Sequence, residues 1–299
     1  MTQLRRIIVG HNFFPDGEVA VRSAVALAER SGAEILLTHI VEPFPLSLRM
    51  GFPTVPAQKL LEEAVSHTHD QLTDLAARSE YASVRIEVDT HQGKPFVELI
   101  TTCRHWHADL IVVGAPTHDL DRFLGSTTER VVRKASTPVL VAKQPLAIGP
   151  KTILVPTDFS PASKPAAEEA LTLVRGFGGR IIFVHVLDLS YIYPVGFGGE
   201  AYVPPPLTVQ DFELDWQAFL SDLPLGGGLV WEKQTREGHA AQTITEIAAE
   251  VEADLVVIGT HGRTGLAHIL LGSVAERVIR TTACSVLTVR PDGFRFELP

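Results

Sequence analysis

The sequence of this chain of 299 residues contains an internal repeat, in which the second half matches the first. The segment RRIIVGHNFF, which begins at Arg5, aligns with KTILVPTDFS, which begins at Lys151, at an offset of 146 residues. The segments that begin at Gly93 and Gly238 align at an offset of 145. Because the offset stays almost constant along a whole half, the repeat predicts two homologous domains in tandem.

We place the two domains at residues 1–145 and 150–299, joined by a linker that contains proline and glycine. In the second half, short apolar and β-branched runs predict five strands, at residues 152–156, 180–187, 229–234, 254–259 and 285–290. The segments between them place apolar residues three and four apart, the stripe that packs a helix on a sheet. Strands that are apolar throughout require a parallel sheet covered on both faces. We therefore expect each half to be a doubly wound α/β domain with right-handed crossovers.

Composition excludes several classes of partner. The formal net charge is -9 and no run of five Lys or Arg occurs, which argues against nucleic acids and anionic membranes. The longest apolar runs are shorter than the roughly 20 residues that span a bilayer, so no membrane anchor is expected. Two cysteines are too few for a disulfide framework, which indicates a cytoplasmic protein.

Two loops of the second half are the candidate site. Ligands of an open α/β sheet bind at the carboxyl ends of the strands, where the winding reverses. PTDFS (Pro156 to Ser160) follows the first predicted strand, and GTHGRTG (Gly259 to Gly265) follows the fourth. If these strands are neighbours, the two loops face each other across one crevice. Asp158 in the first loop can then accept hydrogen bonds from ribose hydroxyls or from a base amine.

The second loop has the composition of a phosphate cradle. Gly259, Gly262 and Gly265 have no Cβ, so we expect positive φ angles and a close approach of backbone N–H groups to a ligand. Gly272 and Ser273 open the next predicted helix, where unpaired N–H groups and the helix dipole favour an anion and the serine adds a hydroxyl.

These motifs together resemble the universal stress protein family. The resemblance rests on the spacing Gly259-x2-Gly262-x9-Gly272-Ser273 and on ILVPTDFS, HVLD and DLVVIG, and it covers the second half fully and the first more loosely. It implies a five-stranded parallel sheet of order 3-2-1-4-5 in each half and ATP as the ligand. It also implies pairing through the fifth strands, which the two halves can achieve within one chain as a pseudo-dimer. Chains can further associate as a homodimer, and a protein partner is expected without being identified.

The resemblance implies a nucleotide site in the second half. It places Asp158 and the backbone of Val186 at the ribose and adenine, and the glycine loop with Ser273 at the phosphates. The complete set of predicted site residues is Pro156, Thr157, Asp158, Val186, Ile258, Gly259, His261, Gly262, Arg263, Gly272, Ser273 and Val274. His261 and Arg263 can supply positive charge to the γ-phosphate, and Ser273 can help to hold Mg²⁺. Hydrolysis needs acidic metal ligands, and none is evident in the loop, so we expect slow turnover at most.

The first half departs from the pattern at the decisive positions. Asn12 stands where the second half has Asp158, Thr117 stands where it has Gly262, and the loop before Gly125 is two residues shorter. A threonine at a positive φ angle carries a steric cost that glycine avoids. We therefore expect the first half to bind nucleotide weakly or not at all and to act as the structural partner of the second.

Three functions remain compatible with the sequence. The first is a cytoplasmic ATP-binding stress-response protein whose nucleotide state serves as a signal. The second is an interaction or scaffold module that keeps the fold without binding nucleotide. The third is a slow ATPase or nucleotidyl-transfer enzyme. The intact glycine spacing favours the first over the second, and the absence of a further acid/base motif disfavours the third.

Overall fold

The chain folds into two compact α/β units. The computed structural model describes residues 4–43, 57–115, 124–146, 149–188, 212–262, 271–291, 293–294 and 296. The first unit comprises Met1–Gly149 together with Arg295–Pro299, and the second comprises Pro150–Phe294. Each unit is a parallel sheet with helices on both faces, which confirms the predicted fold class.

The first unit alternates strands and helices. Its elements are β1 (Arg6–Gly10), α1 (Pro15–Ser31), β2 (Glu34–Val41), α3 (Ala57–Ala76), the 3-10 turn η1 (Ser79–Tyr81), β3 (Ile86–Gln92), α4 (Pro95–His105), β4 (Leu110–Gly114), α5 (Ser126–Lys134) and β5 (Val139–Ala142). The strands pair in parallel in the order β3-β2-β1-β4-β5. This is the order that the resemblance implies, with the reversal of winding between β1 and β4.

The second unit repeats the arrangement. Its elements are β6 (Thr152–Pro156), α6 (Lys164–Phe177), β7 (Arg180–Leu187), α7 (Glu213–Ser221), β8 (Val230–Glu237), α8 (Ala240–Glu250), β9 (Leu255–Gly259), α9 (Ser273–Thr281) and β10 (Ser285–Val289). The strands pair in parallel in the order β8-β7-β6-β9-β10. The carboxyl ends of β6 and β9 therefore meet at the reversal of winding, as the candidate site requires.

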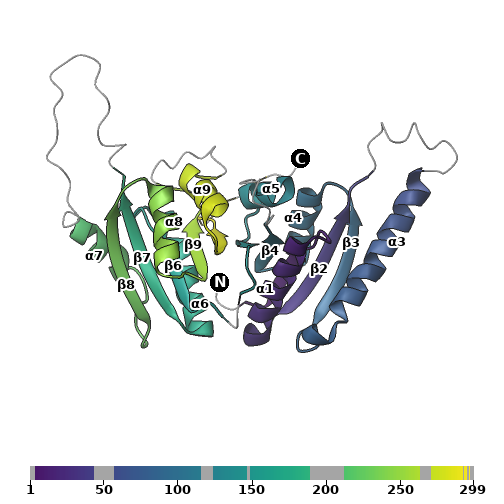
Figure 1. The fold of residues 1–299 in the computed structure, drawn as a ribbon, viewed down its shortest axis with the longest axis horizontal. Helices are drawn as coiled ribbons and strands as arrows, with labels where there is room; N and C mark the ends of the chain where they lie inside the picture. Colours follow the sequence, from purple (N-terminus) through teal and green to yellow (C-terminus); the bar gives the residue numbers. More distant parts are fainter. Residues whose placement is uncertain are drawn as a thin grey trace, which may run out of the picture. The chain divides into compact units, whose positions relative to one another are not determined.

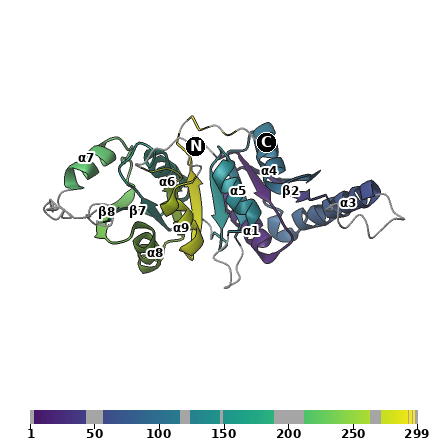
Figure 2. The same cartoon turned by 90° about the horizontal axis from the view of Figure 1, so that it is seen from above.

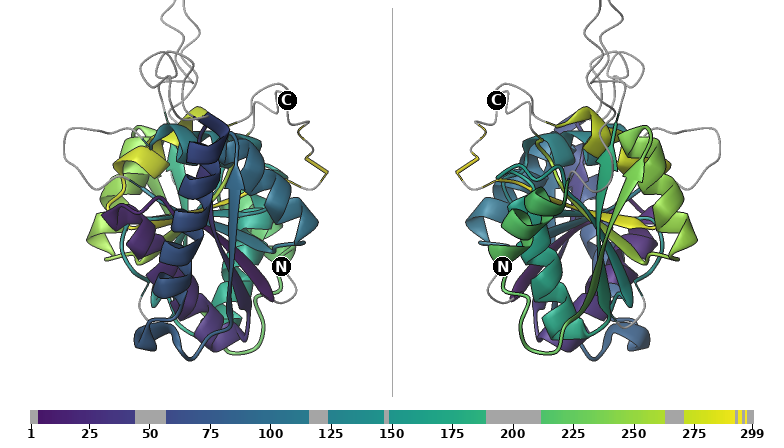
Figure 3. Two further views of the ribbon diagram at one scale, coloured as in Figure 1. Left: turned by 90° about the vertical axis from the view of Figure 1, so that its right-hand side faces the viewer. Right: turned by 90° about the vertical axis from the view of Figure 1, so that its left-hand side faces the viewer.

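The helices form two layers in each unit. In the second unit, α6 and α7 lie on one side of the sheet and α8 and α9 lie on the other (Figure 2). In the first unit, α3 runs alongside β2 and β3, which it contacts (Figures 1 and 3). This division follows from right-handed crossovers, because the chain first moves outward from the central strand and then returns past it.

Local sequence explains where these elements begin and how they pack. Proline occupies the first turn of α1, α4 and α6, where a missing N–H costs no hydrogen bond. Gly32 ends α1 with a φ angle of 72°, a left-handed conformation that glycine adopts without strain. Every residue of the central strands β6 and β9 is buried, as expected for strands covered on both faces.

Both cysteines are buried, as the sequence suggested. Burial raises the pKa of the Cys103 thiol to about 11, so this residue is protonated at neutral pH and behaves as a small apolar side chain. Over the described part of the chain, no helix combines the length and the apolar character needed to cross a bilayer.

The two units carry an ion pair of opposite polarity at equivalent places. In the first unit, Nη1 of Arg78, just after α3, lies 2.7 Å from Oε1 of Glu18 in α1. In the second unit, Nζ of Lys164 in α6 lies 3.2 Å from Oδ2 of Asp222, just after α7. Glu18 and Lys164 correspond at the repeat offset of 146. Both pairs are partly exposed, so each contributes little to stability.

Candidate functional site

The turn after β6 is held by its own side chains. The backbone N–H and the hydroxyl of Ser160 both donate to Oδ1 of Asp158, at 3.0 and 2.6 Å. Oγ1 of Thr157 accepts the N–H of Phe159 at 3.0 Å and lies 2.9 Å from Oγ of Ser163. The hydroxyl of Thr157 therefore stabilises the turn, and the donors of Ser160 within it orient the carboxylate of Asp158.

The structure brings the Asp158 turn and the glycine loop together. A Cβ built on Gly262 would stand 2.9 Å from Oδ2 of Asp158, so the backbone of one loop lies directly beside the carboxylate of the other. Only a glycine leaves that carboxylate in its present position, because real Cβ atoms do not approach so closely. The two loops therefore meet at the reversal of winding, where the sequence places the candidate site.

The described glycines of the loop allow neighbouring atoms to come close to the backbone, and they do not adopt unusual dihedral angles. Gly259 and Gly262 have φ angles outside the left-handed region, so the expectation of positive φ is wrong for them. A Cβ on Gly259 would lie 2.9 Å from the carbonyl oxygen of Ala162, and one on Gly272 would lie 3.3 Å from that of Thr260. Gly259 therefore lets the loop pack against the segment just before α6, and Gly272 lets the end of the loop return to Thr260.

The first turn of α9 offers backbone donors to the same crevice. Gly272 is its N-cap residue, and no side chain caps the helix. Ser273 at the first helical position is exposed and Val274 is half-buried. The acid in this turn, Glu276, accepts a hydrogen bond from Arg280 at 2.7 Å, which offsets its negative charge. The helix end therefore keeps the N–H groups and the positive dipole end that favour an anion.

The backbone of Val186 faces the crevice from the side of β7. The N–H of Thr157 donates to the carbonyl oxygen of Val184 at 2.8 Å, so Val184 directs that oxygen toward β6. Alternate residues of a parallel strand direct their backbone groups to the same neighbour. Val186 therefore points to the same side, beyond Pro156 where β6 has ended.

The remaining predicted site residues take different positions. Pro156 is the last residue of β6, and the side chain of Ile258 is buried in the core with 5% of its surface exposed. His261 is half-buried, and its Nδ1 lies 3.0 Å from Oγ1 of Thr260. Arg263 lies outside the described residues.

Sequence reasoning missed the role of Phe159. Its φ angle is 61°, an unfavourable value for an aromatic residue, and its ring lies 4.3 Å from the ring of His185 and 4.9 Å from that of Trp216. The aromatic cluster therefore holds the residue that follows Asp158. Phe13 at the equivalent place has a φ angle of 60°, so the phenylalanine shared by NFF and DFS was the available signal.

The equivalent turn of the first unit is closed on itself. Oδ1 of Asn12 accepts the N–H of Phe14 at 3.1 Å, and its Nδ2 donates to Oδ2 of Asp16 at 2.9 Å, so both ends of the amide are engaged. A Cβ on Gly114 would overlap the carbonyl oxygen of Asp16, which shows how tightly α1 sits on the end of β4. Thr117 lies outside the described residues.

His11 replaces Thr157 in the first unit, and Gly17 replaces Ser163. The imidazole takes the space of the Thr–Ser hydrogen bond, since a Cβ on Gly17 would lie 2.9 Å from the ring. The N–H of Phe13 donates to Nδ1 of His11, so a neutral ring carries its proton on Nε2, which is buried without a hydrogen-bond partner in the described structure. Burial lowers the pKa of His11 from 6.5 to about 4.

This buried histidine makes the first unit sensitive to acid. Its pKa is lower in the folded state than in the unfolded state, so the unfolded chain binds more protons between pH 6.5 and 4. We expect the stability of the unit to fall by about 3 kcal/mol over that interval, since one pKa unit corresponds to ~1.4 kcal/mol. Hydrogen exchange of the β1 and α1 amides measures the loss. The His11→Thr/Gly17→Ser variant, which copies the second unit, should lose less, and an equal loss in both chains would contradict this account.

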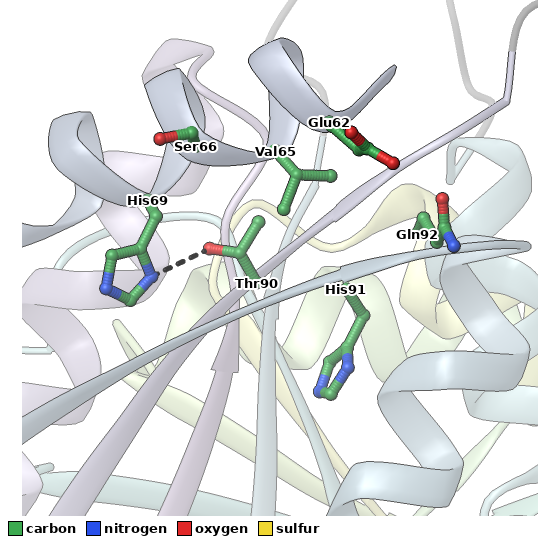
Figure 4. Close-up of a pocket in the computed structure, with 7 residues that line it drawn as sticks. All are labelled: Glu62, Val65, Ser66, His69, Thr90, His91 and Gln92. Carbon is green, nitrogen blue, oxygen red and sulfur yellow. Dashed lines mark hydrogen bonds between the residues drawn. The ribbon is translucent and has the colours of Figure 1, made fainter. Parts of the chain in front are cut away.

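A cavity of about 570 Å³ opens in the first unit between α3 and the end of β3 (Figure 4). Thr90 points toward His69, whose Nδ1 is 3.4 Å from its hydroxyl, whereas His91 points away from α3. In the second unit the matching threonine, Thr235, accepts the indole N–H of the buried Trp216 at 2.9 Å. The described residues contain no group of three His, Cys, Asp or Glu suited to a metal. We interpret the cavity as the space that an indole fills in the other copy.

Comparison with known proteins agrees with this duplicated architecture. The sequence model of the universal stress protein family matches residues 3–143 and again residues 149–290. The chain belongs to the universal stress protein family. It is a tandem member, because each unit contains one complete match.

Relatives of this universal stress protein share both domains or one. A universal stress protein of Mycolicibacterium smegmatis is 28% identical over 292 residues, which cover 95% of this chain and 97% of that relative. Universal stress protein MJ0531 of Methanocaldococcus jannaschii is 34% identical over 140 residues, covering 47% of this chain and 82% of the relative. The crystal structure of a universal stress protein from Archaeoglobus fulgidus has a TM-score of 0.71 at 19% identity, covering 98% and 99% of the two chains. This last likeness shows the fold.

Proposed function

We propose that the second unit binds ATP in the crevice between β6 and β9, and that the bound nucleotide acts as a signal in a cytoplasmic stress response. The contact of Asp158 Oδ2 with the backbone at Gly262 carries the proposal. It joins a hydrogen-bond acceptor suited to ribose with a loop that leads to an uncapped helix N-terminus suited to phosphate. One extended ligand with both a sugar and an anionic end satisfies both features.

Each part of the nucleotide has a matching group. The backbone of Val186, directed past the end of β6, suits the polar edge of adenine. Asp158, held by Ser160, suits the ribose hydroxyls. The first turn of α9 with Ser273 suits the phosphates, and the serine hydroxyl can join Mg²⁺ that enters with ATP. The carboxylate of Glu276 beside this turn is engaged by Arg280, so we expect hydrolysis to be slow at most.

The first unit is assigned a structural role. The amide of Asn12 is engaged at both ends within its own turn. A ligand there would have to break the Asn12–Asp16 hydrogen bond before it could bind. We therefore expect one ATP per chain.

Calorimetric titration of ATP into the full chain tests the proposal. We expect a stoichiometry of one and, for Asp158→Ala, an affinity lower by about tenfold or more, because a hydrogen bond to a charged group contributes roughly 1.5–3 kcal/mol. Asn12→Ala is the matched control and should bind as the wild type does. Absence of binding by the wild type would overturn the proposal, two ATP per chain would overturn the role of the first unit, and rapid ADP release would identify an ATPase.

A further inference from the structure

An aromatic residue beyond β10 packs against the glycine loop. The ring of Phe294 lies 5.8 Å from the ring of His261, at an interplanar angle of 52°. The guanidinium of Arg290 lies 4.0 Å from the centroid of the Phe294 ring. The N–H of Phe294 donates to the carbonyl oxygen of Pro291 at 3.4 Å, and Gly293 has a φ angle of 79°, so a turn returns the ring toward the sheet. Phe294 is thus in contact with a histidine and an arginine.

His261 is held on a second side by its neighbour. Its Nδ1 lies 3.0 Å from Oγ1 of Thr260, and Thr260 is itself almost fully buried, with its N–H donating to the carbonyl oxygen of Val289 at 3.0 Å. The imidazole therefore has an anchored hydroxyl at one nitrogen and an aromatic ring beside it. These contacts restrict its rotation at the position next to Gly262, where the loop meets Asp158.

This contact is made by a residue that follows the last strand of the second unit. The match to the family model ends at residue 290, so Phe294 lies beyond it. In the first unit, the residues that follow β5 are KQPLAIGP, which contain no aromatic side chain. The extra ring therefore accompanies the unit that carries the candidate nucleotide site.

We propose that Phe294 is a positioning residue for the phosphate side of the nucleotide site. Its ring, stacked on the guanidinium of Arg290, holds the imidazole of His261 in one orientation beside the glycine loop. A side chain that is already ordered loses less conformational entropy when a ligand arrives, which strengthens binding. The inference rests on the proposed binding of ATP and assigns His261 to the phosphates. Phe294 therefore affects the affinity for ATP more than the affinity for AMP.

Titrations of ATP and AMP into full-length variants test this role. Phe294→Ala should lower the affinity for ATP about two- to tenfold, the range expected from one aromatic contact, and leave the affinity for AMP unchanged. Phe294→Tyr keeps the ring and should restore ATP affinity. Phe296→Ala is the matched control, because that ring lies 4.9 Å from Nζ of Lys134. Unchanged ATP affinity in Phe294→Ala, or an equal loss for ATP and AMP, would overturn the inference.

A second measurement needs no nucleotide. In protein labelled with ¹³C at the histidine ε1 carbon, the His261 resonance is assigned by its loss in His261→Gln. Phe294→Ala should shift this resonance, since the ring current of the neighbouring phenyl group disappears, and Phe296→Ala should not. An unshifted resonance refutes the contact and with it the positioning role. If Phe294→Ala shifts the His261 resonance but the wild-type chain binds no ATP, the contact stands and the proposed function is refuted.

Discussion

Replacing Gly262 by valine is expected to abolish measurable ATP binding, with the dissociation constant raised about a hundredfold or more, or ~2.7 kcal/mol. The first atom of the new side chain would lie 2.9 Å from Oδ2 of Asp158, so the loop or the carboxylate must move out of the crevice. The fold should survive, because Gly262 is half-buried at a loop and, among the described residues, its Cβ would crowd the side chain of Asp158 alone. Calorimetry with ATP measures the effect, and circular dichroism checks the fold.

A graded series makes this prediction specific. Gly262→Ala adds one carbon and should weaken ATP less than Gly262→Val does, since its side chain is smaller. Gly226→Val is the control, because a Cβ at Gly226 meets no atom of the described residues within 4 Å. Wild-type affinity in Gly262→Val would show that the contact with Asp158 has no part in binding, and an equal loss in Gly226→Val would show a general effect on the unit.

Replacing Trp216 by alanine is expected to destabilise the second unit by about 3–5 kcal/mol, the usual cost of removing a buried tryptophan side chain. The indole is 2% exposed, its N–H donates to Thr235 at 2.9 Å, and it contacts Phe159 and Phe219. Its loss leaves a cavity and an unpaired hydroxyl. Because Phe159 follows Asp158 and holds a positive φ angle, ATP affinity should fall as well.

Hydrogen exchange resolves the two units and measures this effect. Amides of β7 and β8 should exchange faster in Trp216→Ala, whereas those of β2 and β3 in the first unit serve as an internal reference. Trp231→Ala is the matched control, because that indole is 37% exposed on the edge strand β8 and its loss should cost much less. Equal acceleration in both variants would show that the buried indole of Trp216 contributes no more to the stability of the unit than the exposed one of Trp231.

The strands were predictable wherever burial is complete. The apolar runs at residues 152–156 and 180–187 match β6 and β7 as observed. The strand predicted at residues 229–234 instead extends through Glu237, where Leu187 pairs with Glu237 in the register of β7 and β8. β8 is the edge of its sheet and presents charged side chains to solvent, so apolar periodicity could not reveal its final residues.

The meeting of the two candidate loops was predictable, but the packing that joins them was not. Two arguments predicted that Asp158 lies opposite the glycine loop: the alignment of the repeats, and the tendency of ligands to bind at the carboxyl ends of parallel strands. The structure places the two loops side by side in this way. The sequence predicted positive φ angles for the glycines, whereas the structure shows that they prevent steric clashes between loops. Such clashes depend on the three-dimensional packing of segments distant in sequence, which a local sequence pattern does not encode. Phe159 and Phe294 were missed for the same reason, since the contacts of each are with residues distant in sequence.

The opposed ion pairs have a consequence for how a duplicated chain folds. Tandem copies with similar helices are prone to exchange equivalent segments during folding. Exchange here would place Glu18 opposite Asp222 and Lys164 opposite Arg78, so both native attractions would become repulsions between like charges. Each pair contributes little to the stability of its own unit. Together they favour correct pairing over exchanged pairing, because an exchanged helix would bring like charges together.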